Sequence, residues 1–283
     1  MSLTLSGLLK RYYRKIRTMK QSIELEQPFV FTVISGKGGV GKSMTSVNMA
    51  TMLSKLGYKV ALLDADLGLA NCATLLNEPV SSTVSTWIEG KCGIEDLPYY
   101  TSGITLITGA NEPGENKFKA DLFMDALDQV TVYLKQDHDF VIIDTPAGAG
   151  EMALWALDIS QVGILVLVDE PTAISDVYRL CKYVFNIDPE YNFASIVNYA
   201  ESEETAQSTY QRFNTILNYF LNKQTQYFGF IPASDLVRQS VHKQKPLLQM
   251  EVPDPLLKEF EFIAQNVLAY AKNQEKTLLK TVH

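Results

Sequence analysis

Short apolar runs recur along the chain and alternate with longer stretches whose apolar residues follow helical spacing. The runs are rich in β-branched residues and cover residues 29–35, 59–63, 104–108, 140–144, 161–168, 193–198 and 226–231. Continuous apolar runs of this length are typical of strands buried in a parallel sheet. Helical spacing covers residues 43–56, which Gly57 closes, and residues 119–135, 205–221 and 254–271. The pattern therefore predicts an α/β fold.

A glycine-rich turn, GKGGVGKS, joins the first predicted strand to the first predicted helix. Strand, glycine-rich turn and helix form the context of a phosphate-binding P-loop, because glycines let successive backbone N–H groups turn toward the phosphates. A turn without a chemical role is the alternative, and the complete spaced motif disfavours it. The predicted nucleotide contacts are Gly36, Lys37, Gly38, Gly39, Val40, Gly41, Lys42, Ser43 and Met44.

Two aspartates lie at or just after the ends of predicted strands. Asp144 closes the run DFVIID, which is the Walker B arrangement, and Asp66 lies in DADLGLAN after an earlier strand. Ligands of open α/β sheets bind beyond the carboxyl ends of the strands, so Asp64 and Asp66 should face the P-loop, and Asp144 should lie beside Ser43. We predict that Ser43, Asp66 and Asp144 hold Mg²⁺ and that Asp66 orients the attacking water. For Asp66, a turn-capping role is the alternative.

Composition narrows the setting of the protein. The 283 residues are 46% hydrophobic, and Cys72, Cys92 and Cys181 show no CxxC or Cys/His spacing, which favours a reducing cytoplasm over disulfides or zinc. No apolar run approaches the roughly 20 residues that span a bilayer, and no secretory signal is visible. The expected location is the cytoplasm.

Charge is distributed unevenly along the chain. Residues 1–21 hold six Lys or Arg and no acid, so the other residues hold 19 basic against 32 acidic groups, a balance of −13. This acidic body disfavours nucleic-acid binding. The basic arm, residues 1–28, has Leu and Tyr on one helical face. Such a helix could bind a membrane surface, dock in a partner's groove or pack on the domain itself. Met19 is an alternative translation start. We expect an ATPase domain over residues 29–271 and a tail over 272–283.

The motifs together resemble those of a known family. GKGGVGKS, with its early Lys37, resembles the deviant Walker A loop of the MinD and ParA ATPases. Together with LLDADLGLAN, DFVIIDTPAG, EPTAISDVY, VNYAESEE and IPASDLVRQSVHKQKP, it is most similar to the flagellar-number regulators of the FlhG/FleN (YlxH) group, over Phe29 to Ala271. The resemblance implies a P-loop NTPase fold with a mostly parallel sheet of about eight strands and helices on both faces.

The resemblance also implies a function. It implies an ATP-dependent homodimer with weak, Mg²⁺-dependent ATP hydrolysis, in which Lys37 reaches the partner's phosphates and Asn198 reads the adenine edge. Implied partners are an FlhF-type GTPase, a flagellar switch protein or a flagellar transcriptional regulator, with peripheral attachment at the inner face of the cell membrane. Residues 1–28 lack the DQAxxLR-type motif of that group, and NQEKTLLKTVH is a poor match to its membrane-targeting tail.

Two other classes remain as alternatives. A ParA-like ATPase that positions DNA or cargo would need a basic surface, which the acidic body does not favour. An iron–sulfur carrier would need paired cysteines, which the sequence does not have.

Overall fold

A single eight-stranded sheet forms the centre of the protein. The computed structural model describes residues 25–66, 71–110 and 120–281, with side chains up to residue 276. The strand order is β3-β4-β2-β5-β1-β6-β7-β8, and β3 is antiparallel to β4 while the other neighbours are parallel. The strands are β1 (Phe29–Ile34), β2 (Val60–Asp64), β3 (Tyr99–Thr101), β4 (Ile104–Thr108), β5 (Phe140–Asp144), β6 (Val162–Leu167), β7 (Phe193–Ala200) and β8 (Gln226–Pro232).

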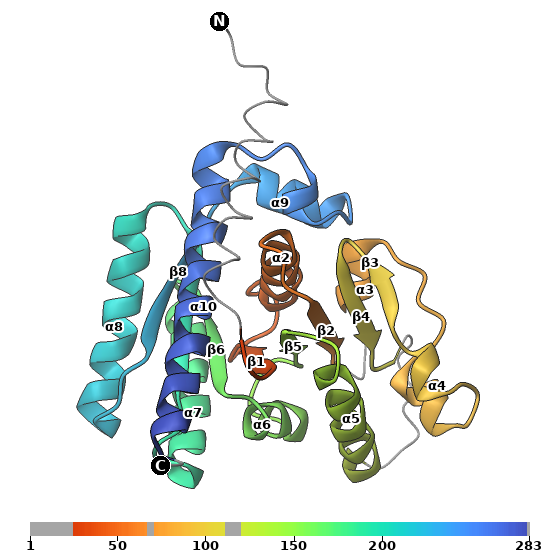
Figure 1. Cartoon of the computed structure of the whole chain (residues 1–283). Coiled ribbons are helices and arrows are strands. Elements are labelled where there is room, and N and C mark those ends of the chain that lie inside the picture. The colour runs from red at the N-terminus through yellow and green to blue at the C-terminus, as the bar shows by residue number, and fades with distance from the viewer. Residues whose placement is uncertain (1–24, 67–70, 111–119, 282–283) are drawn as a thin grey trace, which may run out of the picture.

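Helices cover both faces of this sheet, as predicted. In Figure 1, α2 lies above the central strands, and α5 and α6 lie below them. The first face packs against α2 (Lys42–Lys55), α3 (Asn71–Leu76), α9 (Asp235–His242) and α10 (Asp254–Thr281). The second packs against α4 (Val84–Ile88), α5 (Ala120–Lys135), α6 (Glu151–Asp158), α7 (Pro171–Ile187) and α8 (Glu203–Leu221). Two short 3₁₀ turns, η1 (Ile94–Asp96) and η2 (Leu247–Gln249), complete the elements.

Local sequence explains where the helices begin and end. Gly57, at φ 93°, follows the last turn of α2, which confirms the predicted glycine stop. Pro171 opens α7, and Ser202 caps α8 through a reciprocal pair of hydrogen bonds with Thr205. None of the described helices is both long and apolar enough to cross a membrane.

The ends of the chain differ from the prediction at one point. The expected tail over residues 272–283 is not a separate segment, because α10 continues without a break to Thr281. The stretch NQEKTLLKT contains no glycine or proline that would stop a helix, and its residues favour helix. Residues 1–24 of the basic arm lie outside the described residues. Where the chain becomes described, the backbone N–H groups of Glu26 and Gln27 donate to Glu275 Oε1 at 2.8 and 3.3 Å.

Candidate nucleotide-binding site

The glycine-rich loop follows β1 and leads directly into α2. Gly39 and Gly41 have φ of 80° and 88°, which side-chain-bearing residues rarely adopt, and Gly41 is the N-cap of α2. A Cβ at Gly41 would lie 2.2 Å from Asn198 Nδ2, so only glycine fits there. At Gly38 and Gly39, in contrast, an added Cβ would meet no atom within 4 Å. The backbone of the loop is therefore open to approach at Gly38 and Gly39.

Asp144 is the centre of the polar contacts beside this loop. It ends β5 with no exposed surface, and it accepts hydrogen bonds from Lys42 Nζ at 2.9 Å, Ser43 Oγ at 2.6 Å and Ser46 Oγ at 2.8 Å. The P-loop lysine and serine predicted from the sequence thus meet the predicted Walker B aspartate. This arrangement places one ammonium, one hydroxyl and one carboxylate at the N-terminus of α2, where the helix dipole favours anions.

Burial changes the pKa of the charged groups in this cluster. For Lys42, burial acts to lower the pKa, but the charge of Asp144 and its hydrogen bond to Nζ outweigh burial, so the pKa is raised. For Asp64, burial and the neighbouring charge of Asp144 raise the pKa to about 7, against hydrogen bonds that favour the carboxylate. Lys42 therefore stays charged, and Asp64 exchanges its proton near pH 7.

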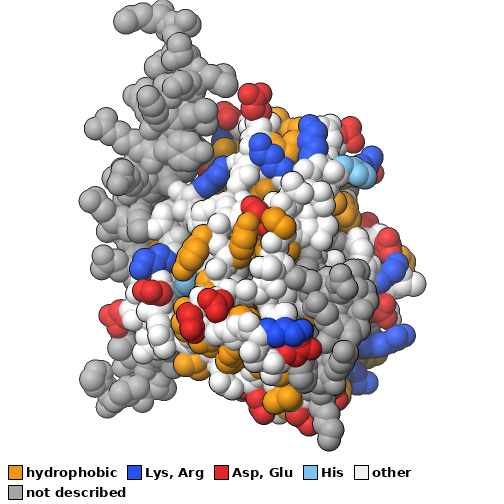
Figure 2. Space-filling model, turned by 90° about the vertical axis from the view of Figure 1, so that its right-hand side faces the viewer, with side chains coloured by type: hydrophobic (Ala, Val, Ile, Leu, Met, Phe, Trp, Pro, Cys, Tyr) orange, Lys and Arg blue, Asp and Glu red, His pale blue; other side chains and the backbone are white. Residues whose placement is uncertain are grey.

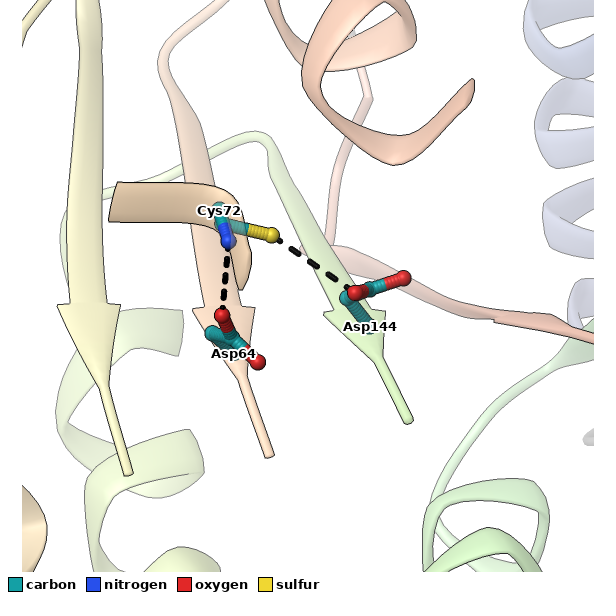
Figure 3. A group of neighbouring side chains, drawn as sticks. All are labelled: Asp64, Cys72 and Asp144. Atoms are coloured by element: carbon teal, nitrogen blue, oxygen red, sulfur yellow. Dashed lines mark hydrogen bonds between the residues drawn. The ribbon is translucent and has the colours of Figure 1, made fainter. Parts of the chain in front are cut away.

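Asp64 anchors the segment that follows β2. It lies opposite Asp144 in the register of β2 and β5. Its Oδ2 accepts from Cys72 N at 2.9 Å and its Oδ1 from Asp66 N at 3.1 Å, while Cys72 Sγ contacts Asp144 Oδ2 at 3.6 Å. Figure 3 shows these three side chains converging from β2, α3 and β5. Both described ends of the connection between β2 and α3 are thereby held by one buried carboxyl group.

Asp66 lies beside this cluster, and its backbone N–H donates to Asp64 Oδ1. Asp66 Oδ2 accepts a hydrogen bond from Asn71 Nδ2 at 3.1 Å. In the described parts of the chain, the acidic side chain that groups with Cys72 and Asp144 at metal-binding distances is that of Asp64. The structure thus brings Ser43 and Asp144 together, and the predicted role of Asp66 in holding Mg²⁺ and water stays a prediction.

Lys37 is engaged at the surface and not with the buried cluster. Its Nζ lies 2.8 Å from Glu170 Oε2, in an ion pair whose side chains are 46% and 57% exposed. The hydrogen bond and the charge of Glu170 raise the pKa of Lys37. Lys37 and Lys42, five residues apart in one loop, therefore have different partners and different degrees of burial.

Asn198 contacts the P-loop backbone. The side chain is buried, Nδ2 donates to Val40 O at 2.8 Å, and Oδ1 accepts from Tyr199 N at 2.9 Å. The residue therefore lies at the predicted site, and both ends of its amide are occupied by protein atoms. Recognition of adenine by Asn198 would use the second amide hydrogen or the second lone pair of Oδ1, and it stays a prediction.

Three residues of the site have roles that the sequence pattern does not assign. Asp64 ends a strand that points toward the loop, Ser46 follows Ser43 by about one helical turn, and Glu170 reads as an ordinary loop carboxylate. The strand-end position of Asp64 predicts that it faces the P-loop, and the spacing of Ser46 is a signal that could have found that residue. The pairing of Glu170 with Lys37 has no such signal, because 133 residues separate the two.

The residues present fit a nucleotide and Mg²⁺. The space beside Gly38 and Gly39, the ammonium of Lys42 and the N-terminus of α2 suit phosphates. The hydroxyl of Ser43 and the carboxylate of Asp144 provide the hard oxygen ligands that Mg²⁺ prefers.

Comparisons with known proteins agree with this geometry. Residues 28–268 match the family model ParA, described as NUBPL iron-transfer P-loop NTPase. The chain is 32% identical to the antiactivator FleN of Pseudomonas aeruginosa PAO1, over 88% of this chain and 89% of that protein. It is 30% identical to the flagellum site-determining protein YlxH of Helicobacter pylori 26695, over 82% and 79% of the two chains.

A solved structure shows the same fold. The septum site-determining protein MinD from Pyrococcus horikoshii OT3, complexed with Mg-ADP, superposes with a TM-score of 0.67. The match has 24% sequence identity and covers 85% of this chain and 96% of that chain.

Proposed function

Because this chain belongs to the ParA/MinD family of P-loop NTPases and is an ATPase of that family, we propose that it is an ATP-dependent dimerisation switch that controls the number or placement of flagella. Weak hydrolysis of ATP to ADP and phosphate would reset the switch. The observation that carries the flagellar role is the similarity to FleN and YlxH, which extends over more than four fifths of this chain in both cases. The P-loop and Asp144 lie within residues 28–268, which match the ParA family model.

The buried cluster accounts for what the chain's own residues do with the nucleotide. Lys42 leaves Asp144 and neutralises the phosphates, at a point where burial makes its charge effective. Ser43 and Asp144 are the residues that would hold Mg²⁺, which would supply charge neutralisation between the phosphates. Asp66 lies on the same edge of the sheet, where its carboxylate can orient water.

The position of Lys37 supports a dimer. Its ammonium is exposed and pairs with Glu170 at the start of α7, outside the Lys42–Asp144 cluster. An exposed ion pair contributes little stability, so Lys37 can exchange Glu170 for another anion at low cost. We propose that this anion is the nucleotide phosphate of the partner subunit.

A matched pair of lysine variants tests the dimer. We expect Lys37→Ala to bind ATP but to remain monomeric in size-exclusion chromatography with light scattering, because the contact across the dimer is lost. Lys59→Ala is the control: Lys59 is also exposed and paired, with Asp137 at 3.7 Å, and it lies at the start of β2, away from the P-loop. An ATP-dependent dimer of Lys37→Ala equal to the wild type would refute the role across the interface.

The flagellar role needs a cellular test. Deletion of the gene should change the number or position of flagella per cell in electron micrographs, and a Lys42→Met copy should fail to restore it. Unchanged flagellation would contradict this part of the proposal while leaving the ATPase intact. The proposed partners are an FlhF-type GTPase, a flagellar switch protein or a flagellar transcriptional regulator, and the proposed location is the cytoplasm with peripheral contact at the inner face of the membrane.

The face of the protein drawn in Figure 2 gives no support for DNA binding as the main role. Figure 2 shows the face over β3, α4 and α5, on which acidic and basic side chains are interspersed and no continuous basic area is visible. Residues 22–283 carry a net charge of −13. Salt-dependent DNA binding in the presence of ATP would favour a ParA-like positioning ATPase instead.

A further inference from the structure

Three metal-ligating side chains meet behind the P-loop, and each comes from a different element. Asp64 ends β2, Cys72 lies in the first turn of α3, and Asp144 ends β5 (Figure 3). One ligand atom from each lies within 4.8 Å of the other two, and none of the three residues has exposed surface. Binding of phosphates or Mg²⁺ does not require a thiol at this position. The proposed nucleotide site therefore leaves Cys72 unexplained.

The ionised form of this cluster matches the charge of a divalent cation. Two carboxyl groups and a thiol are fully buried here, and the ammonium of Lys42, 8% exposed, contacts one of them. Burial raises the pKa of the Cys72 thiol and of Asp64 in the free protein, so full ionisation accompanies the binding of a cation; in that ionised form three negative charges face the one positive charge of Lys42. Uncompensated buried charge is costly, and a divalent cation brings the balance to zero.

The donor set indicates which kind of cation fits. Cys72 Sγ and Asp144 Oδ2 are 3.6 Å apart. A tetrahedral zinc shell, with Zn–S of about 2.3 Å and Zn–O of about 2.0 Å, places sulfur and oxygen ligands about 3.5 Å apart. Thiolates bind soft or borderline ions, whereas Mg²⁺ prefers oxygen ligands alone. We propose that Asp64, Cys72 and Asp144 form a binding site for a thiophilic divalent cation of the Zn²⁺ class.

Such a site competes with the nucleotide site. Ser43 Oγ donates to the same oxygen of Asp144 that Cys72 contacts, and Ser43 is partly exposed. An ion bound to Cys72 engages this oxygen, and the thiol proton is released to solvent. Asp144 is then unavailable for Mg²⁺, so the thiophilic cation acts as an inhibitor of Mg²⁺-dependent nucleotide binding.

Cadmium provides a direct probe, because thiolate coordination to Cd²⁺ gives an ultraviolet charge-transfer band. The full chain carrying Cys92→Ser and Cys181→Ser retains Cys72 alone and is titrated with Cd²⁺ in the absence of nucleotide and Mg²⁺. We expect one Cd²⁺ per chain, the charge-transfer band and release of the Cys72 thiol proton, joined below about pH 7 by the proton of Asp64. Adding Cys72→Ser should abolish the band and weaken Cd²⁺ binding. Because Cys72 is a direct ligand, the loss of affinity should exceed the roughly 10- to 100-fold that removal of an outer-shell partner costs.

The same experiment can overturn the proposal independently of ATP. Absence of the band in the protein with Cys72 alone, or equal Cd²⁺ affinity after Cys72→Ser, would refute the site. Circular dichroism checks that Cys72→Ser folds. If it does not fold, the rate of alkylation of Cys72 by iodoacetamide in the single-cysteine protein decides: Zn²⁺ should slow it at least about tenfold, and an unchanged rate would contradict the site.

Discussion

Asp64 should make the stability of the nucleotide-free protein depend on pH. Burial and the charge of Asp144 raise its pKa from 3.8 to about 7. Between these values the folded protein retains a proton that the unfolded chain has lost, so the free energy of unfolding falls as the pH rises from about 4 to 7. At about 1.4 kcal/mol per pKa unit, the full effect is on the order of 4 kcal/mol, and about 2–3 kcal/mol of it falls between pH 5 and pH 8.

Asp64→Asn removes this titration. The amide oxygen can still accept from Cys72 N or Asp66 N, and loss of the other bond costs about 1–3 kcal/mol at every pH. The informative quantity is therefore the difference in unfolding free energy between variant and wild type, which should move by about 2–3 kcal/mol in favour of the variant from pH 5 to pH 8.

Urea unfolding in EDTA, followed by tryptophan fluorescence at several pH values, measures this difference. Asp125→Asn on the exposed side of α5 is the control and should parallel the wild type. A constant difference between Asp64→Asn and the wild type across the range would show that Asp64 does not titrate there, and the electrostatic reasoning would be wrong.

Three further substitutions test individual contacts. Gly41→Ala should reduce nucleotide affinity at least about tenfold in isothermal titration calorimetry, because the new Cβ meets Asn198 Nδ2 and the φ of 88° is strained; normal affinity would contradict this account of the loop. Lys42→Met should abolish nucleotide binding and leave Asp144 without its cation, which should lower the free energy of unfolding by about 3–5 kcal/mol in urea titrations; an unchanged value would show that the pair is dispensable. Asp66→Ala should retain an ATP dimer in light scattering while phosphate release slows about 100-fold or more; wild-type turnover would exclude Asp66 from hydrolysis.

The sequence was sufficient for most of the fold because its strongest signals are local. Seven strands were predicted close to their observed bounds, since short apolar β-branched runs between helices are typical of buried parallel strands. The edge strand β3 was not predicted, because Tyr99–Thr101 has only three residues, one of them exposed, and no alternation to read. The continuation of α10 was missed because a polar helix end has no apolar periodicity.

The sequence predicted the site residues that belong to a spaced motif, but not those that meet only through packing of distant segments. The P-loop spacing and the strand-end aspartate identified Lys42, Ser43 and Asp144, which the structure brings within hydrogen-bonding distance. The pairing of Lys37 with Glu170 and the burial of Cys72 beside Asp144 depend on how distant segments meet in the sheet. No local pattern encodes such contacts.

The hydrogen bond between Gln27 and Glu275 has a practical consequence for tethering and labelling the protein. Both residues lie next to the start of β1, whereas the P-loop follows the end of the same strand, six residues away or roughly 20 Å. A tether attached at either of these points would hold the nucleotide-binding edge turned away from its anchor. A surface-immobilised or fluorophore-labelled form made there should bind nucleotide as the free chain does, and both attachment points would report from the same pole of the molecule.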